Sequence, residues 1–105
     1  MADIDARPNE DRRERLGRIA FRAWRRGFRE ADLVLGPFVD QVGPTLADDD
    51  LDSLEALLGW DDDHELYAWI IGTAPTPLEY ETPVMTKIRG FMRDHVAAAV
   101  AEGAG

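Results

Sequence analysis

The chain contains no cysteine, a single serine and two histidines. The missing cysteines exclude a disulfide framework, a zinc site of the cysteine type and an iron–sulfur cluster. Ser53 lies in an acidic segment, and the residue four positions after His64 is Ala68, so neither a serine triad nor a zinc-protease helix is predicted. The glycines never form a phosphate-cradling loop. The sequence therefore offers no active site of its own.

Long apolar runs are missing as well. The longest are a few residues, such as residues 97–101, whereas roughly 20 apolar residues are needed to span a bilayer. The first residues lack the apolar segment of a secretory signal, and their acidic side chains argue against a mitochondrial transit peptide. We therefore expect a cytoplasmic protein with no membrane insertion.

Charge is present in excess of one sign, but it is unevenly distributed. The 105 residues carry a formal charge of -9. Residues 1–30 hold nine arginines against six acidic residues, whereas residues 31–105 hold three basic residues against fifteen acidic ones. An acidic protein is normally a poor nucleic-acid binder, but the arginine-rich head keeps a binding module for nucleic acid or an acidic partner as an alternative.

Apolar residues recur at steps of three and four, and no alternating strand pattern of useful length occurs. The pattern predicts an all-α fold, a compact bundle of four to five short helices in one domain over residues 11–101. Residues 1–10 and 102–105 are expected to be flexible tails. Acidic triplets and single glycines mark the helix ends, with helices expected from about residue 11, near residues 28–30, at residues 48–50, from residues 61–63 and at Pro83.

Two of these helices carry specific expectations. The first should bury a stripe that includes Ile19 and Trp24 and should end at Gly27 in a left-handed conformation. The second should bury Leu33 and Phe38 but be kinked or broken at Pro37, since proline inside a straight helix costs roughly 3 kcal/mol. Trp69, by its spacing in the fourth helix, is expected in the core.

A basic ridge runs along the first helix. Its members are spaced three and four residues apart and lie roughly 140° around the helix from the apolar stripe; they are Arg15, Arg18, Arg22, Arg25 and Arg29. The ridge ends at the junction R-R-G-F-R-E, residues 25–30. There, either the arginines solvate one helix face while Glu30 pairs with a nearby arginine, or a guanidinium and a carboxylate project together toward a partner.

At this junction the sequence resembles the succinate dehydrogenase assembly factor 2 family. Arg26, Gly27 and Glu30 fit the family's R-G-x-x-E signature, residues 49–58 resemble its acidic-start, leucine-rich helix, and residues 64–72 resemble its L-x-x-W-x-x-G block. The signature alone is weak, but the three matches come in the family's order and cover roughly residues 12–75.

The resemblance implies a five-helix bundle and a function. Members promote covalent attachment of FAD to the flavoprotein subunit of succinate dehydrogenase and, in bacteria, of fumarate reductase, while a histidine of the flavoprotein forms the bond. The expected docking surface is centred on Arg26, Gly27 and Glu30, with the other arginines of the junction around it: Arg22, Arg25 and Arg29. We expect a monomer that binds no cofactor stably and acts on FAD held by its partner.

Two other functions compete with this interpretation. A nucleic-acid module could use the ridge, but the acidic remainder would repel a polyanion, and no aromatic residues alternate with the arginines for base stacking. An enzyme acting on flavin directly could use Glu30 as a base, but that would need a cofactor cavity.

Overall fold

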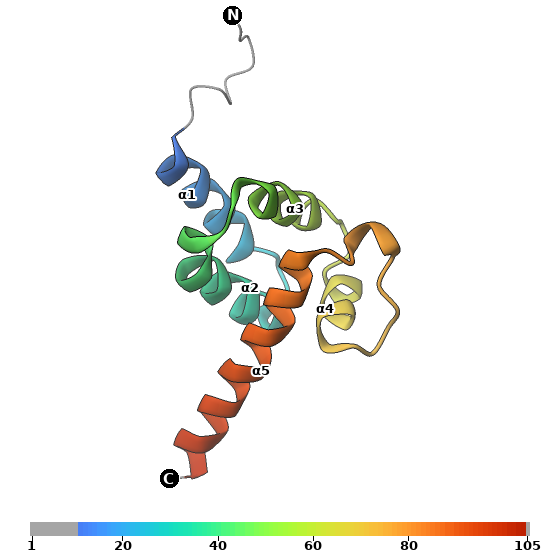
Figure 1. The fold of residues 1–105 in the computed structure, drawn as a ribbon. Coiled ribbons are helices and arrows are strands. Elements are labelled where there is room, and N and C mark those ends of the chain that lie inside the picture. The colour runs from blue at the N-terminus through green and yellow to red at the C-terminus, as the bar shows by residue number, and fades with distance from the viewer. Residues whose placement is uncertain (1–10, 105) are drawn as a thin grey trace, which may run out of the picture.

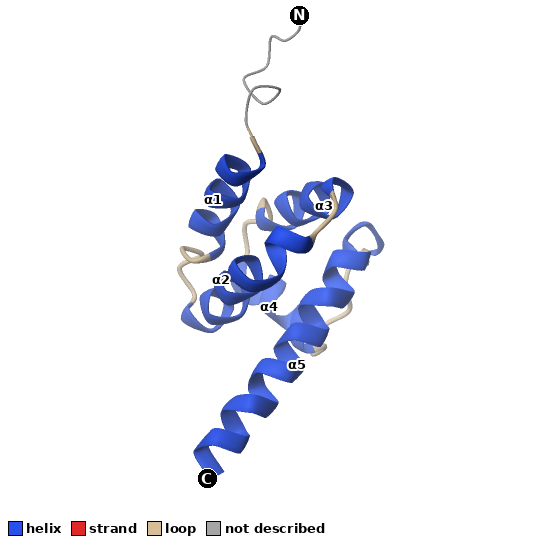
Figure 2. Cartoon of the chain, turned by 60° about the vertical axis from the view of Figure 1, so that its left-hand side comes forward, coloured by secondary structure: helices blue, strands red, loops and turns tan. Residues whose placement is uncertain are grey.

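The computed structural model of the chain describes the backbone of residues 11–104 and the side chains of residues 11–95. Its elements, in chain order, are α1 (Arg12–Ala23), α2 (Arg29–Val42), η2 (Gly43–Thr45), α3 (Asp48–Leu58), α4 (Asp63–Ile71), η3 (Leu78–Tyr80) and α5 (Pro83–Ala104), where η marks a short 3-10 helix. This part of the chain contains no strand (Figure 2). The predicted all-α bundle is therefore confirmed.

The structure describes only one of the two segments that were expected to be tails. Residues 1–10 lie outside the described residues. Helix α5 continues through Ala104, so the backbone of residues 102–104 is helical where a tail was expected.

Local capping explains where the helices begin and end. Asp11 accepts a hydrogen bond from the backbone N–H of Glu14 at 2.8 Å, and Glu14 accepts one from Asp11 at 3.2 Å, a reciprocal capping box at the start of α1. Asp62 caps α4 without a reciprocal bond, by accepting from the backbone N–H of Glu65 at 3.0 Å. Gly72 ends α4 in a left-handed conformation with φ +84°. Helices α1 and α4 therefore begin at acidic residues because the first backbone N–H groups of a helix have no partner within it, and a carboxylate accepts from them.

One apolar core joins all five helices. Its largest fully buried side chains include Trp69, Phe38 and Met85. The first turns of α5 pack into this core through Val84, Met85 and Ile88, and Figure 1 shows the later part of α5 continuing past the other helices. Trp69 is therefore a core residue, as predicted. No helix in the described segment has the length and apolar character needed to cross a membrane.

Helix α2 and two apolar side chains differ from the sequence-based predictions. Helix α2 is unbroken and carries Pro37 inside it, so the alternative of a broken helix is wrong. Burial of Val34 and Phe38 on either side of the proline outweighs its local cost. Leu33 and Trp24 are not core residues, because they remain 46% and 38% exposed.

Candidate docking site at the α1–α2 turn

The R-R-G-F-R-E junction forms the turn between α1 and α2. Helix α1 ends at Ala23 with Trp24 as its C-terminal cap, so Gly27 is not the helix-ending residue that the sequence predicted. Gly27 nevertheless has φ +89°, the left-handed conformation that favours glycine. A Cβ atom at this position would lie 3.8 Å from Asp63 Oδ2, an ordinary contact. The backbone conformation, rather than lack of space within the chain, is what requires glycine.

Arg26 fastens this turn to the rest of the bundle. Its side chain is 9% exposed, and its guanidinium meets Asp63 of α4 with Nε–Oδ1 at 2.8 Å and Nη2–Oδ1 at 2.7 Å. The same guanidinium donates to the carbonyl oxygens of Leu58 and Trp60, in the connection between α3 and α4. The backbone N–H of Arg26 donates to Asp32 of α2 at 2.7 Å. The first residue of the R-G-x-x-E signature therefore positions the turn and is not displayed on the surface.

The other polar residues of the signature region are exposed. Gly27, Arg29 and Glu30 all face solvent. Among the described residues, neither Arg29 nor Glu30 has a side-chain hydrogen bond or ion pair. The pairing of Glu30 with a neighbouring arginine, one of the two possibilities open from the sequence, is thus not found here. A guanidinium and a carboxylate from consecutive residues stand unpartnered beside a left-handed glycine.

Phe28 packs the turn against α4 and places His64 beside it, a residue that was not predicted for the site. Its ring centroid lies 4.0 Å from that of His64 and 5.4 Å from that of Tyr67, both on α4. His64 borders the turn because its ring contacts Phe28, and it is exposed to solvent. The spacing of His64 and Tyr67 places them on one face of α4, but nothing in the sequence indicates that Phe28 covers that face.

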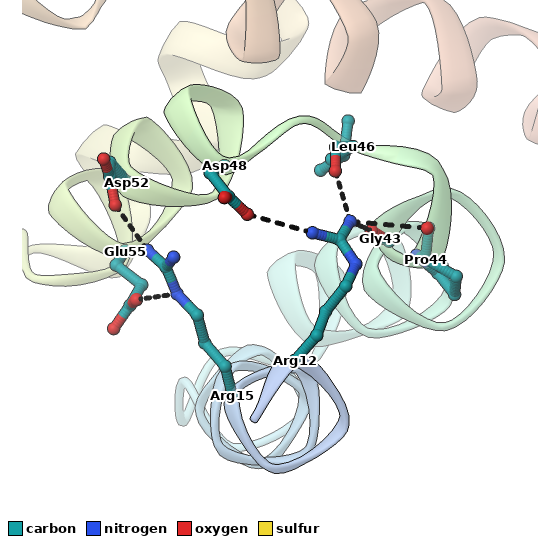
Figure 3. Close-up of polar contacts among 8 residues, drawn as sticks. All are labelled: Arg12, Arg15, Gly43, Pro44, Leu46, Asp48, Asp52 and Glu55. Atoms are coloured by element: carbon teal, nitrogen blue, oxygen red, sulfur yellow. Dashed lines mark hydrogen bonds and ion pairs between the residues drawn. The ribbon is translucent and has the colours of Figure 1, made fainter. Parts of the chain in front are cut away.

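The basic ridge divides into two parts. On the side of α1 that faces α3, Arg15 Nε lies 2.7 Å from Glu55 Oε1, while the Arg15 Nη2 group pairs with Asp52 (Figure 3). Arg18 also pairs with Glu55. Burial alone would raise the pKa of Glu55, but hydrogen bonds from the two arginines outweigh burial and lower this pKa below its usual value. The hydrogen bond to Asp52 is the main cause that raises the pKa of Arg15.

The ion pairs of Arg15 and Arg18 with Asp52 and Glu55 form what we call the α1–α3 clamp, and Arg12 and Arg22 extend it at its two ends. Arg12 Nη1 lies 3.1 Å from Asp48 Oδ1, and its Nη2 donates to carbonyl oxygens of the η2 region, including that of Pro44 at 3.3 Å (Figure 3). Arg22 Nη2 donates to the carbonyl oxygen of Leu58 at 3.0 Å. Three of the five ridge arginines, namely Arg15, Arg18 and Arg22, therefore hold α1 against α3 and its ends.

Arg25 and Arg29 are the ridge arginines left facing solvent, but they do not continue the ridge along the first helix as predicted, because α1 ends at Ala23, Arg25 lies in the turn and Arg29 begins α2. The guanidinium carbon of Arg25 lies 3.9 Å from the centroid of the Phe21 ring, and no carboxylate pairs with Arg25 among the described residues. Of the six residues predicted for the docking surface, four are thus exposed in or beside the turn, namely Arg25, Gly27, Arg29 and Glu30. Arg22 and Arg26 are turned inward. No group of three or more potential metal ligands gathers among the residues that the structure describes.

Comparison with known proteins identifies relatives of the chain. Residues 17–92 match the family model described as the flavinator of succinate dehydrogenase. Succinate dehydrogenase assembly factor 2-A, mitochondrial, of Drosophila erecta is 31% identical over 100 residues, which are 94% of this chain and 59% of that protein. Succinate dehydrogenase assembly factor 2, mitochondrial, of Drosophila grimshawi is 30% identical over 95 residues, which are 90% of this chain and 65% of that protein. The chain spans roughly three fifths of the length of these relatives.

These matches confirm the resemblance stated from the sequence and correct one expectation. The cytoplasmic location is contradicted, because the relatives carry names that place them in mitochondria. That expectation depended on features that the first residues lack, and such a lack does not determine the compartment in which a protein works.

Proposed function

The chain belongs to the succinate dehydrogenase assembly factor 2 family, and from this premise we propose that it promotes covalent attachment of FAD to the flavoprotein subunit of succinate dehydrogenase. It acts by docking on that subunit through the α1–α2 turn. The single observation that carries this proposal is the unpartnered pair Arg29 and Glu30 beside Gly27, on a turn that Arg26 holds in place.

Each part of the turn has a separate task in this proposal. Arg26 forms its hydrogen bonds within the bundle, to Asp32 and Asp63, and these bonds order the turn before the partner binds. Docking therefore costs little conformational entropy. Gly27 lets the partner's backbone approach, because it has no side chain to hold that backbone away. Arg29 and Glu30 then offer a donor fork and an acceptor to the partner surface.

Docking can accelerate flavin attachment without a catalytic group from this chain. The bond forms when a histidine of the flavoprotein attacks the 8α-methyl carbon of its bound flavin, so the histidine must be aligned and negative charge on the flavin ring must be stabilised. A rigid protein that binds the aligned conformation of the flavoprotein preferentially shifts the population toward it. The chain thus works as an assembly factor, and the flavin stays with the partner.

The competing nucleic-acid module is disfavoured by the charge arrangement. Arg15 and Arg18 are engaged with acidic residues of α3, and Arg22 with a carbonyl group. A nucleic acid would therefore find few arginines available to bind its phosphates, and the acidic residues 31–105 would repel it.

Flavin fluorescence of the flavoprotein subunit, separated on a denaturing gel, tests the proposal. The subunit is produced with the wild-type chain, with Glu30→Ala, with Gly27→Arg, or with no assembly factor. We expect the wild type to increase covalent fluorescence and both variants to reduce it to the level without the chain, while circular dichroism shows that they remain helical. Glu79→Ala, an exposed acid on η3, is the matched control and should keep full stimulation. Undiminished fluorescence with Glu30→Ala and Gly27→Arg would refute the site assignment.

A further inference from the structure

The outer face formed by α1 and α2 exposes several large apolar side chains next to the turn. Phe21 is 59% exposed, Trp24 38% and Leu33 46%. Phe21 lies one helical turn before Trp24 on α1, and Leu33 lies one turn before Gly36 on α2. Together with the two exposed arginines beside them, these residues form what we call the α1–α2 flank: Phe21, Trp24, Arg25, Arg29 and Leu33.

Trp24 joins the two helices of the flank. Its indole lies directly on Gly36, where a Cβ atom would come within 2.3 Å of Trp24 Cδ2, so only glycine fits under the ring. The indole Nε1 donates to Asp40 Oδ2 at 3.1 Å, which fixes the ring across the seam. The exposed aromatic surface is thus held in one orientation rather than left to rotate freely, and such rigid aromatic groups contribute strongly at interfaces.

The flank carries two arginines that lack a carboxylate partner. Acidic residues outnumber basic ones in this chain by 21 to 12, and Arg12, Arg15, Arg26 and Arg89 each have a carboxylate partner. Arg25 and Arg29 have none among the described residues, and neither do the exposed Arg13 and Arg93, but only Arg25 and Arg29 lie beside exposed aromatic and apolar side chains of α1 and α2. Arg25 instead lies over the Phe21 ring, where its charge remains available to an incoming group. The flank is therefore an apolar, aromatic surface bordered by two unpaired guanidinium groups.

We infer that the α1–α2 flank is a second contact surface for the same flavoprotein subunit, and that it takes an apolar segment of that subunit bordered by carboxylate side chains. This inference rests on the proposed function. Two features select this occupant. The flank shares Arg25 and Arg29 with the docking turn, so a partner seated on the turn extends over it. The unpaired arginines require negative charge, which a second copy of the flank would not supply in comparable amount.

Binding of the wild-type chain and of surface variants to the purified flavoprotein subunit, measured by biolayer interferometry, tests the inference. Phe21→Ser and Arg25→Glu should each raise the Kd about tenfold, since central aromatic and arginine residues dominate such interfaces. The loss in Arg25→Glu should shrink as salt is raised, because screening removes the charge contribution. Circular dichroism and the thermal midpoint show that each variant is folded.

Matched controls separate the flank from general surface effects. Leu78→Ser removes an apolar side chain that is 89% exposed on η3, and Arg93→Glu makes the same charge change on α5. Both should keep the wild-type Kd.

The outcomes distinguish this inference from the proposed function. If the wild type stimulates flavin attachment and the flank variants bind as it does, the inference is overturned and the proposed function stands. If the wild type neither binds nor stimulates, both are overturned. If Phe21→Ser instead converts a dimer of the chain into a monomer in sedimentation, the flank is a self-interface and the inference is overturned.

Discussion

Helix α1 and the turn that follows it use the same residue type for opposite purposes. Toward α3, Arg15 and Arg18 converge on Glu55, and their guanidinium groups are largely withdrawn from solvent. Just beyond the end of α1, Arg25 in the turn and Arg29 at the start of α2 have no carboxylate partner among the described residues. One pair of arginines stabilises the fold, whereas the other is available to a partner.

The position of acidic residues on the facing element produces this difference. Helix α3 begins with an acidic triplet and continues with Asp52 and Glu55 on the face that meets α1. Helix α2, which carries the other half of the flank, holds Glu30, Asp32 and Asp40: Asp32 accepts from the backbone of Arg26, Asp40 accepts from the indole of Trp24, and Glu30 faces solvent without a partner among the described residues. An arginine's role in this chain therefore follows from the acidic residues that its neighbouring helix presents.

Arg26→Ala should have the largest effect on stability. It would leave the Asp63 carboxylate and two carbonyl oxygens without their donors in a largely buried site, and breaking such a pair costs about 3 kcal/mol or more. Urea unfolding monitored by tryptophan fluorescence gives the change in the free energy of unfolding. Arg26→Lys keeps the charge but lacks the planar fork, so it should recover only part of the loss. A loss below about 1 kcal/mol in Arg26→Ala would contradict the positioning role.

Glu55→Gln should have an intermediate effect that depends on pH. Because the folded-state pKa of Glu55 is lowered, its carboxylate contributes stability above the unfolded-state pKa of about 4.3, and this contribution is lost as pH falls through the folded-state value. At pH 7 the substitution should cost about 1.5 kcal/mol, because two charged hydrogen bonds are weakened. Urea unfolding at pH 7, 5, 4 and 3 should show the wild type and the variant converging at low pH.

A matched control belongs to the same experiment. Glu79→Gln removes an exposed carboxylate that has no ion pair among the described residues, and it should cost less than about 0.5 kcal/mol at pH 7. If Glu55→Gln and wild type differed by the same amount at pH 3 as at pH 7, the α1–α3 clamp would not depend on the charge of Glu55.

Local features of the fold were predictable from the sequence because their causes are local. The start of α4 at the acidic triplet and its end at Gly72 follow from a side-chain cap and a left-handed glycine within one helix. The burial of Trp69 follows from helical spacing. Pro37 shows the limit of this reasoning, since local cost alone allowed a broken helix, whereas α2 continues through the proline with its neighbours buried.

The candidate site was predictable in position but not in the role of each residue. The junction could be found from its motif, and a helical wheel shows that the ridge lies away from the apolar stripe. A wheel cannot show that Arg26 reaches Asp63, 37 positions away, or that Arg15 reaches Glu55, 40 positions away. These contacts depend on how α1, α3 and α4 are placed relative to one another, and they decide which arginines remain for a partner.

Arg29→Ala should have the smallest effect on stability, and it tests the exposed side of the contrast. Because Arg29 has no ion pair or hydrogen bond from its side chain among the described residues, its removal should change the free energy of unfolding by less than about 0.5 kcal/mol. Arg25→Ala should cost about 0.5 kcal/mol, the value of an exposed cation–π contact, through loss of its position over Phe21. Urea unfolding of both variants, beside Arg15→Ala as the paired-arginine reference, measures the difference, and flavin attachment should fall in both despite their stability. If Arg29→Ala destabilised the chain as much as Arg15→Ala, then Arg29 would serve the fold, and the separation between stabilising and available arginines would fail.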